Sequence, residues 1–79
     1  MSAPVLVPSL PQASLDSSSL KSVGYSAETG TLEITFCSGS IYRYSGVPPH
    51  IYQALLDASS KGRYFTAAIR SSFPFQRIQ

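Results

Sequence analysis

Residues 59–70 carry the side chains in this chain that are best suited to hold a phosphate group. The six candidate phosphate-binding residues are Ser59, Ser60, Lys61, Gly62, Arg63 and Arg70. The first backbone N–H groups of a helix lack partners within it and lie at the positive end of its dipole, so a helix beginning here would favour an anion. Lys61 and Arg63 add positive charge, and Arg70 follows Arg63 by seven residues, which places both on one side of a helix. A serine-capped helix with a solvated basic face is the alternative interpretation.

Two tyrosines raise a second possibility, the stacking of nucleic-acid bases. In the segment GSIYRYSGVPPHIY, Tyr42 and Tyr44 alternate with Ile41 and Arg43, so both rings lie on one face of a strand. Exposed rings beside the basic residues would offer a stacking platform. Aromatic residues on a strand face more often belong to the core, so we assign Tyr42 and Tyr44 mainly to the core and keep stacking as the alternative.

The remaining reactive side chains do not form a recognisable catalytic or metal-binding set. His50 and Cys37 are the sole residues of their types, so neither a zinc site nor a Cys-His dyad is supported. The acidic residues are scattered along the chain and predict no acid-base pair; they are Asp16, Glu28, Glu33 and Asp57. The SSKG segment lacks the glycine spacing of a P-loop. We therefore expect a protein that is not an enzyme and uses no cofactor and no metal.

Three predicted strands form the frame that positions these residues. They span residues 20–26, 31–36 and 40–44, and TLEITF alternates strictly between apolar and polar residues. A three-residue turn over residues 37–39, with Gly39 in the left-handed conformation, fixes one register. Its pairs are Ile34 with Tyr42, Leu32 with Tyr44 and Glu33 with Arg43. A two-residue turn would place Arg43 opposite Ile34, so we predict the first register, which matches apolar with apolar and acid with base.

Two helices are predicted to cover the apolar face of these strands. The first begins at Pro48 and Pro49, and the second begins after Ser59 or Ser60 and ends before Pro74. The final segment FPFQRI is expected to lie extended across either the sheet or a helix. Because strands precede helices along the chain, we predict an α+β fold, in which an antiparallel three-stranded β-meander carries two short helices packed on one face.

Length and composition set limits on the function. The chain has 79 residues, of which 13% are charged, and a formal net charge of +2. It forms one small domain with little room for a deep catalytic cleft, and its charge is too mild to indicate nucleic-acid binding by itself. Residues 1–18, rich in serine and proline, are predicted to be a flexible tail before a domain at residues 19–79. The N-terminal segment has no basic region typical of a signal peptide, and no apolar run is long enough for a membrane span, so we expect a cytoplasmic protein with no membrane partner.

The segment from Leu20 to Ile78 resembles the KTSC domain. Three motifs carry the resemblance: Y-x-Y at Tyr42 and Tyr44, G-V-P at residues 46–48, and an S-x-G-x-Y/F-F pattern at residues 60–65. KTSC domains occur alone in bacterial and phage proteins and at the C-terminus of some lysyl-tRNA synthetases. The family has no established biochemical activity, and its attachment to a tRNA enzyme implies RNA as a partner class.

These observations predict a small non-catalytic binding module with RNA as the leading partner. RNA phosphates would contact the basic helix start at residues 59–63 and Arg70. The alternative is a protein-interaction module, in which another protein or a second copy of the chain binds at a sheet edge or at the apolar C-terminal residues Phe73, Phe75 and Ile78. Salt distinguishes the two, because phosphate contacts weaken as salt rises whereas apolar contacts hardly respond.

Overall fold

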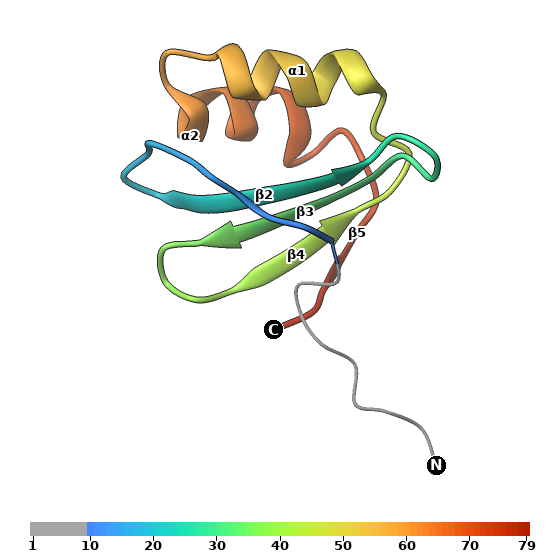
Figure 1. Ribbon diagram of the computed structural model, residues 1–79, viewed down its shortest axis with the longest axis horizontal. Coiled ribbons are helices and arrows are strands. Elements are labelled where there is room, and N and C mark those ends of the chain that lie inside the picture. Colours follow the sequence, from blue (N-terminus) through green and yellow to red (C-terminus); the bar gives the residue numbers. More distant parts are fainter. Residues whose placement is uncertain (1–9) are drawn as a thin grey trace.

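The computed structural model describes residues 10–79, which form an antiparallel sheet covered by a helical layer (Figure 1). The strands are β1 (Ala13–Ser14), β2 (Leu20–Ser26), β3 (Thr31–Phe36), β4 (Ile41–Tyr44) and β5 (Phe75–Arg77). The helical elements are α1 (Pro49–Asp57), α2 (Lys61–Tyr64) and η1 (Phe65–Ile69), a π-helical turn that continues α2. Figure 1 shows the helical elements on one side of the sheet, so the α+β class and the one-sided helical layer are as predicted.

The sheet has five strands in the order β1-β2-β3-β4-β5, so the predicted three-stranded meander is too small. β1 and β5 extend the meander at its two edges, and they contain only two and three residues. Apolar alternation becomes recognisable only over about four or more residues, so strands this short give no period-2 signal. For the C-terminal segment the structure selects the sheet, because β5 pairs with β4.

The turn between β3 and β4 has the predicted geometry. Gly39 has a φ of +101°, and its N–H donates to the carbonyl oxygen of Phe36 at 2.9 Å. The Phe36 N–H donates in turn to the carbonyl oxygen of Ser40 at 2.8 Å. The resulting pairs are Leu32 with Tyr44, Glu33 with Arg43 and Ile34 with Tyr42, as predicted. Alternation along the strands then puts both tyrosines on the face that the helices cover.

The two helices begin in different ways. α1 begins at Pro49, as predicted, because the first helical residue needs no N–H partner and proline already has the required φ. Ser60 occupies the N-cap of α2, but its hydroxyl makes no capping hydrogen bond, so the expected serine cap is wrong. The backbone carbonyl of Ser60 instead accepts the N–H of Tyr64 at 3.0 Å. The start of α2 is therefore held by backbone contacts and by packing.

The hydrophobic core lies between the sheet and the helices. Its buried residues come from both layers and from the loop before α1: Leu20, Val23, Leu32, Ile34, Tyr44, Val47, Leu55, Phe65 and Ile69. Tyr25 ties α1 to the sheet, since its ring stacks on Tyr52 with centroids 4.6 Å apart. Its hydroxyl also donates to the carbonyl oxygen of Val47 at 2.6 Å. Burial of each large side chain contributes roughly 1.5–3 kcal/mol, so this core fixes the helical layer over the sheet.

Residues 10–12 cross the opposite face of the sheet (Figure 1). The N–H of Leu10 donates to Glu33 Oε1 at 3.0 Å. Arg43 donates to Glu33 Oε2 from Nε at 2.9 Å and from Nη2 at 2.7 Å, which confirms the predicted pair. Gly24, the partner of Glu33 on β2, allows the crossing because a Cβ there would lie 2.9 Å from the Pro11 carbonyl oxygen. Glu33 is consequently completely buried.

This crossing segment belongs to the part of the chain that the sequence assigns to a tail. Residues 13–14 form β1, and the N–H of Leu15 donates to the carbonyl oxygen of Lys21 at 2.9 Å. Residues 10–15 are thus joined to the sheet by hydrogen bonds and a short strand pairing. The first nine residues of the expected tail lie outside the described part of the chain, and the boundary at residue 18 stays a prediction.

Candidate functional site

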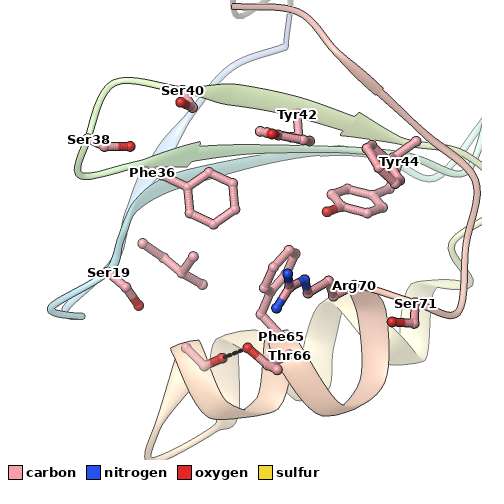
Figure 2. Close-up of a pocket in the computed structure, with 13 residues that line it drawn as sticks. Ser19, Phe36, Ser38, Ser40, Tyr42, Tyr44, Phe65, Thr66, Arg70 and Ser71 are labelled. Carbon is pink, nitrogen blue, oxygen red and sulfur yellow. Dashed lines mark hydrogen bonds between the residues drawn. The ribbon is translucent and has the colours of Figure 1, made fainter.

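A groove opens between the β3–β4 hairpin, the α2–η1 segment and β5 (Figure 2). Its volume is about 680 Å³, a size typical of small-ligand sites. Five rings line it, those of Phe36, Tyr42, Tyr44, Phe65 and Phe75. Its polar groups include the guanidinium of Arg70 and the side chains of Ser19, Ser38, Ser40, Thr66 and Ser71. We call this site the aromatic groove, and its mixed lining suits a planar ligand that carries a negative charge.

The rings of the aromatic groove contact one another in a closed loop. Phe36 meets Tyr42 edge to face with centroids 5.6 Å apart, and Tyr42 meets Phe75 at 5.5 Å. Phe75 meets Tyr44 at 5.5 Å, and Tyr44 meets Phe65 at 5.6 Å. Phe65 closes the loop with Phe36 at 5.5 Å. Separations of this size are typical of favourable aromatic pairs, so rings from four elements hold one another in place.

Tyr42 and Tyr44 differ in exposure although they share a strand face. Tyr44 is 3% exposed and belongs to the core, whereas Tyr42 is half-buried and packs at the margin of the core. Burial raises the pKa of the Tyr44 hydroxyl and the neighbouring Tyr42 raises it further, while Arg70 acts in the opposite direction. The Tyr44 phenol therefore stays protonated at neutral pH and can donate a hydrogen bond into the groove, toward which it points in Figure 2.

Arg70 reaches the aromatic groove at the end of the π-helical turn. The backbone N–H of Arg70 donates to the carbonyl oxygen of Phe65, five residues earlier, at 2.9 Å. In an α-helix the hydrogen-bonded partner lies four residues away, so the wider π turn rotates Arg70 toward the side that Phe65 faces. Within residues 10–79, no other side chain forms a hydrogen bond or ion pair with the Arg70 guanidinium. Its donors are therefore available to a ligand.

A second depression, which we call the basic cleft, holds most of the predicted phosphate-binding residues. Its volume is about 610 Å³, and its lining includes Ser59, Ser60, Lys61, Gly62 and Arg63. Lys61 Nζ donates to the carbonyl oxygen of Ala58 at 2.9 Å, whereas Arg63 is exposed and has no side-chain partner among the described residues. Asp16 also lines the cleft and reduces its positive potential. Arg70 lines the aromatic groove and not this cleft.

The basic cleft and the aromatic groove adjoin each other. Both are lined by Ser19, Gly62 and Thr66. Gly62 packs closely there, because a Cβ at this position would lie 2.5 Å from Ser19 Oγ. The Thr66 hydroxyl donates to the Gly62 carbonyl oxygen at 3.0 Å (Figure 2). A single extended ligand could therefore occupy both depressions by passing this shared wall.

The sequence alone indicates only part of this site. It points to Phe75 as an apolar C-terminal contact, whereas the structure pairs Phe75 with Tyr44 and so brings it into the aromatic groove. Phe36 is recognisable as an inner-face residue of its strand, but its place at the groove depends on the path of the helices. The alternation of Phe73, Phe75 and Arg77 does signal an extended segment. It carries no information about which strand that segment joins.

Neither His50 nor Cys37 is among the residues that line these two depressions. His50 is exposed in the first turn of α1, and Cys37 is exposed in the β3–β4 turn. Among residues 10–79, no group of three or more histidine, cysteine or acidic residues is arranged to hold a metal ion. None of the helices in this part of the chain has both the length and the apolar character needed to cross a membrane.

The family follows from comparison with known proteins. The model of a family described as the KTSC domain matches residues 16–73. The chain belongs to the KTSC domain family. The crystal structure of a KTSC domain protein from Yersinia pestis superposes with a TM-score of 0.83 at 35% sequence identity, covering 89% of this chain and 99% of that one. Sequence resemblance and fold therefore agree.

Curated relatives similar to this chain fall into two settings. An uncharacterised protein from Stutzerimonas stutzeri is 49% identical over 59 residues, which are 75% of this chain and 83% of that protein. A lysine–tRNA ligase from Nostoc punctiforme is 40% identical over 63 residues, which are 80% of this chain but 11% of the ligase. The similarity to the ligase thus concerns a small part of that enzyme.

Proposed function

We propose that this KTSC domain is a non-catalytic module that binds RNA, with phosphate groups held by Lys61, Arg63 and Arg70. The observation that carries the proposal is the placement of these three cations around two adjoining depressions, with both arginine side chains unpaired among the described residues. A phosphate accepts two hydrogen bonds from one guanidinium, which makes arginine well suited to this role. The occurrence of a similar domain in a lysine–tRNA ligase favours RNA among polyanions.

Side-chain charge, more than the helix dipole, supports the phosphate contacts. α2 contains only four residues, and the phosphate contacts are therefore assigned to charged side chains and not to the start of this short helix. The Ser60 hydroxyl makes no capping hydrogen bond to the described residues and can donate to a phosphate oxygen. Ser59 and Gly62 line the same cleft and complete the proposed contact surface.

The number of cations sets the expected salt dependence. Each phosphate neutralised on a single strand contributes roughly −0.7 to the slope of log K against log salt concentration, so three contacts give about −2. Affinity should then fall roughly 20-fold between about 50 and 200 mM salt. The shallow slope agrees with the mild net charge of +2 and implies weak binding at physiological salt.

A fluorescence anisotropy titration with labelled single-stranded RNA tests the proposal. Arg63→Ala should weaken binding at low salt and reduce the slope to roughly −1.4, because one phosphate contact is lost. Lys21→Ala is a matched control, since Lys21 is an exposed cation on β2 that lines neither depression. Absence of RNA binding at about 50 mM salt, or equal effects of the two substitutions, would contradict the proposed function.

A protein-interaction module is a second candidate, favoured by the exposure of the sheet edge at β5. Every residue of β5 is exposed, and Phe75 keeps 55% of its surface accessible. Another protein or a second copy of the chain could add a strand to this edge. Such binding would respond little to salt and would be insensitive to Arg63→Ala, so the titration above separates the two candidates.

A further inference from the structure

We propose that the aromatic groove binds one unpaired nucleobase, stacked against Tyr42 and Phe75, with a neighbouring phosphate held by Arg70. The inference rests on the proposed RNA-binding function and deepens it by assigning a ligand group to a site that phosphate contacts do not explain. The basic cleft would hold the phosphates that continue along the same strand. The two depressions would then act on different chemical parts of one ligand.

The half-buried Tyr42 ring and the exposed Phe75 ring provide the surface for stacking. Figure 2 shows the Tyr42 ring lying along β4, with its face turned toward the groove and the helical layer. Phe75, whose centroid lies 5.5 Å from that of Tyr42, is 55% exposed. Tyr44 and Phe65 are buried and Phe36 is half-buried, and these three rings hold Tyr42 and Phe75 in place through the contacts of the loop. A preorganised aromatic surface of this kind loses little side-chain entropy when a planar ring stacks on it.

Charge complementarity favours a nucleobase over the aromatic side chain of a peptide. Arg70 lines the groove and has no side-chain partner in the described part of the chain. Lys61 and Arg63 continue the positive charge into the basic cleft, past the wall that both depressions share. A nucleic-acid strand carries a phosphate beside every base, so it satisfies the rings and all these cations together. A peptide would need acidic residues at several matched positions.

The hydroxyl groups of the groove predict little preference among bases. The serine and threonine hydroxyls can each donate or accept a hydrogen bond, so they fit either kind of group on a base edge. The Tyr44 hydroxyl adds a donor, and every base edge carries acceptors. Stacking itself tolerates any base, because each has a π face. The groove should therefore recognise that a base is unpaired and accessible, with weak discrimination of its identity.

Two oligomers of equal length separate base binding from phosphate binding. One is a short single-stranded RNA, and the other has the same sugar-phosphate backbone but no bases. The base-containing oligomer should bind about 5- to 150-fold more tightly, the range that corresponds to stacking of one base. Tyr42→Ala should remove this difference and leave the affinity of the abasic oligomer unchanged. Arg63→Ala should weaken both oligomers by the same factor.

Two further variants protect the test against loss of folding. Tyr42→Phe keeps the ring and should retain the preference for bases. Phe75→Ala removes an exposed ring, so it should remain folded and reduce the preference even if Tyr42→Ala does not fold. Thermal melting by circular dichroism establishes which variants are folded.

Each outcome of the experiment bears on a different claim. Equal affinity of the two oligomers for the unaltered protein overturns the base site and leaves phosphate-driven RNA binding intact. A base preference that survives both ring deletions places base recognition elsewhere and also overturns this inference. If neither oligomer binds at low salt, the proposed RNA function and the base site fail together. Tighter binding of the base-containing oligomer that either ring deletion reduces or abolishes supports both claims.

Discussion

Replacement of Tyr44 tests whether the aromatic loop is a structural unit that supports the groove. Tyr44 is 3% exposed and contacts the rings of Phe65 and Phe75 with centroids 5.6 and 5.5 Å away. In Tyr44→Ala, both contacts disappear and a cavity remains between β4 and η1. The neighbouring Leu32, which lies opposite Tyr44 on β3, is already completely buried in its own packing. The cavity can therefore close only if the helical layer moves toward the sheet.

The expected loss of stability is large for a domain of this size. Deletion of a buried aromatic ring typically costs about 3–5 kcal/mol, from lost burial and from the cavity that remains. A domain of this length has a total free energy of unfolding of about 4–12 kcal/mol. At roughly 4–8 °C per kcal/mol, the melting temperature should fall by at least about 12 °C. Tyr44→Ala therefore removes a substantial fraction of the stability.

Thermal and urea unfolding followed by circular dichroism would measure this loss. Tyr44→Phe is the matched control: it keeps the ring, and the Tyr44 hydroxyl has no hydrogen-bond partner among the described residues, so we expect a change below about 1 kcal/mol. Tyr42→Ala should cost less than Tyr44→Ala, because Tyr42 is only half-buried. An unchanged melting curve for Tyr44→Ala, or a loss as large for Tyr42→Ala, would refute the assignment of Tyr44 to the core and Tyr42 to its margin.

Three other perturbations address the opposite face and the titration of the core. Gly24→Ala should lower the free energy of unfolding by about 1–3 kcal/mol and accelerate amide hydrogen exchange in residues 10–15, because the added Cβ overlaps the path of this segment. Unchanged exchange would contradict this packing. Arg43→Ala should cost about 3 kcal/mol in urea unfolding because it leaves the buried Glu33 carboxylate without its cation, and a neutral effect would show that the pair is dispensable. The raised pKa of Tyr44 means that the folded state holds its proton more tightly, so stability should fall as pH rises above the unfolded value near 10. Tyr44→Phe should lack this part of the decline, and identical pH profiles would argue against the shift.

The central hairpin is predictable from sequence because several local signals agree on it. Alternation along TLEITF defines an inner face, and a glycine at position 39 supplies the left-handed residue that a three-residue turn requires. A shift of one residue would have placed Arg43 against Ile34, so the apolar pattern and the charge pair select the same register. This part of the fold can be predicted because the turn residues, the apolar alternation and the charge pair all indicate the same structure.

The edges and the outer face depend on contacts between distant residues, which leave no local pattern. Residues 10–12 look like part of a polar tail, yet the Leu10 N–H reaches Glu33 across 23 positions and helps to bury it. Glu33 itself resembles a solvent-facing residue, because it alternates with Leu32 and Ile34. The sequence indicates its partner Arg43 correctly but gives no sign of its burial. Short edge strands and a crossing segment of this kind are determined by the completed sheet.

The division between core and groove also arises from tertiary structure. Tyr42 and Tyr44 have the same residue type and lie on the same face of one strand, so alternation cannot distinguish them. The α2–η1 segment passes over Tyr44, where Phe65 meets its ring, and leaves Tyr42 half-buried beside Phe75. The π turn then brings Arg70 to the same opening. From the sequence, Arg70 is expected on the same side as Arg63, seven residues earlier, because a regular α-helix is assumed. This irregular turn separates Arg70 from the basic cleft and gives the aromatic groove its only cation among the described residues. A cation beside aromatic rings is the arrangement that a base with its adjoining phosphate requires.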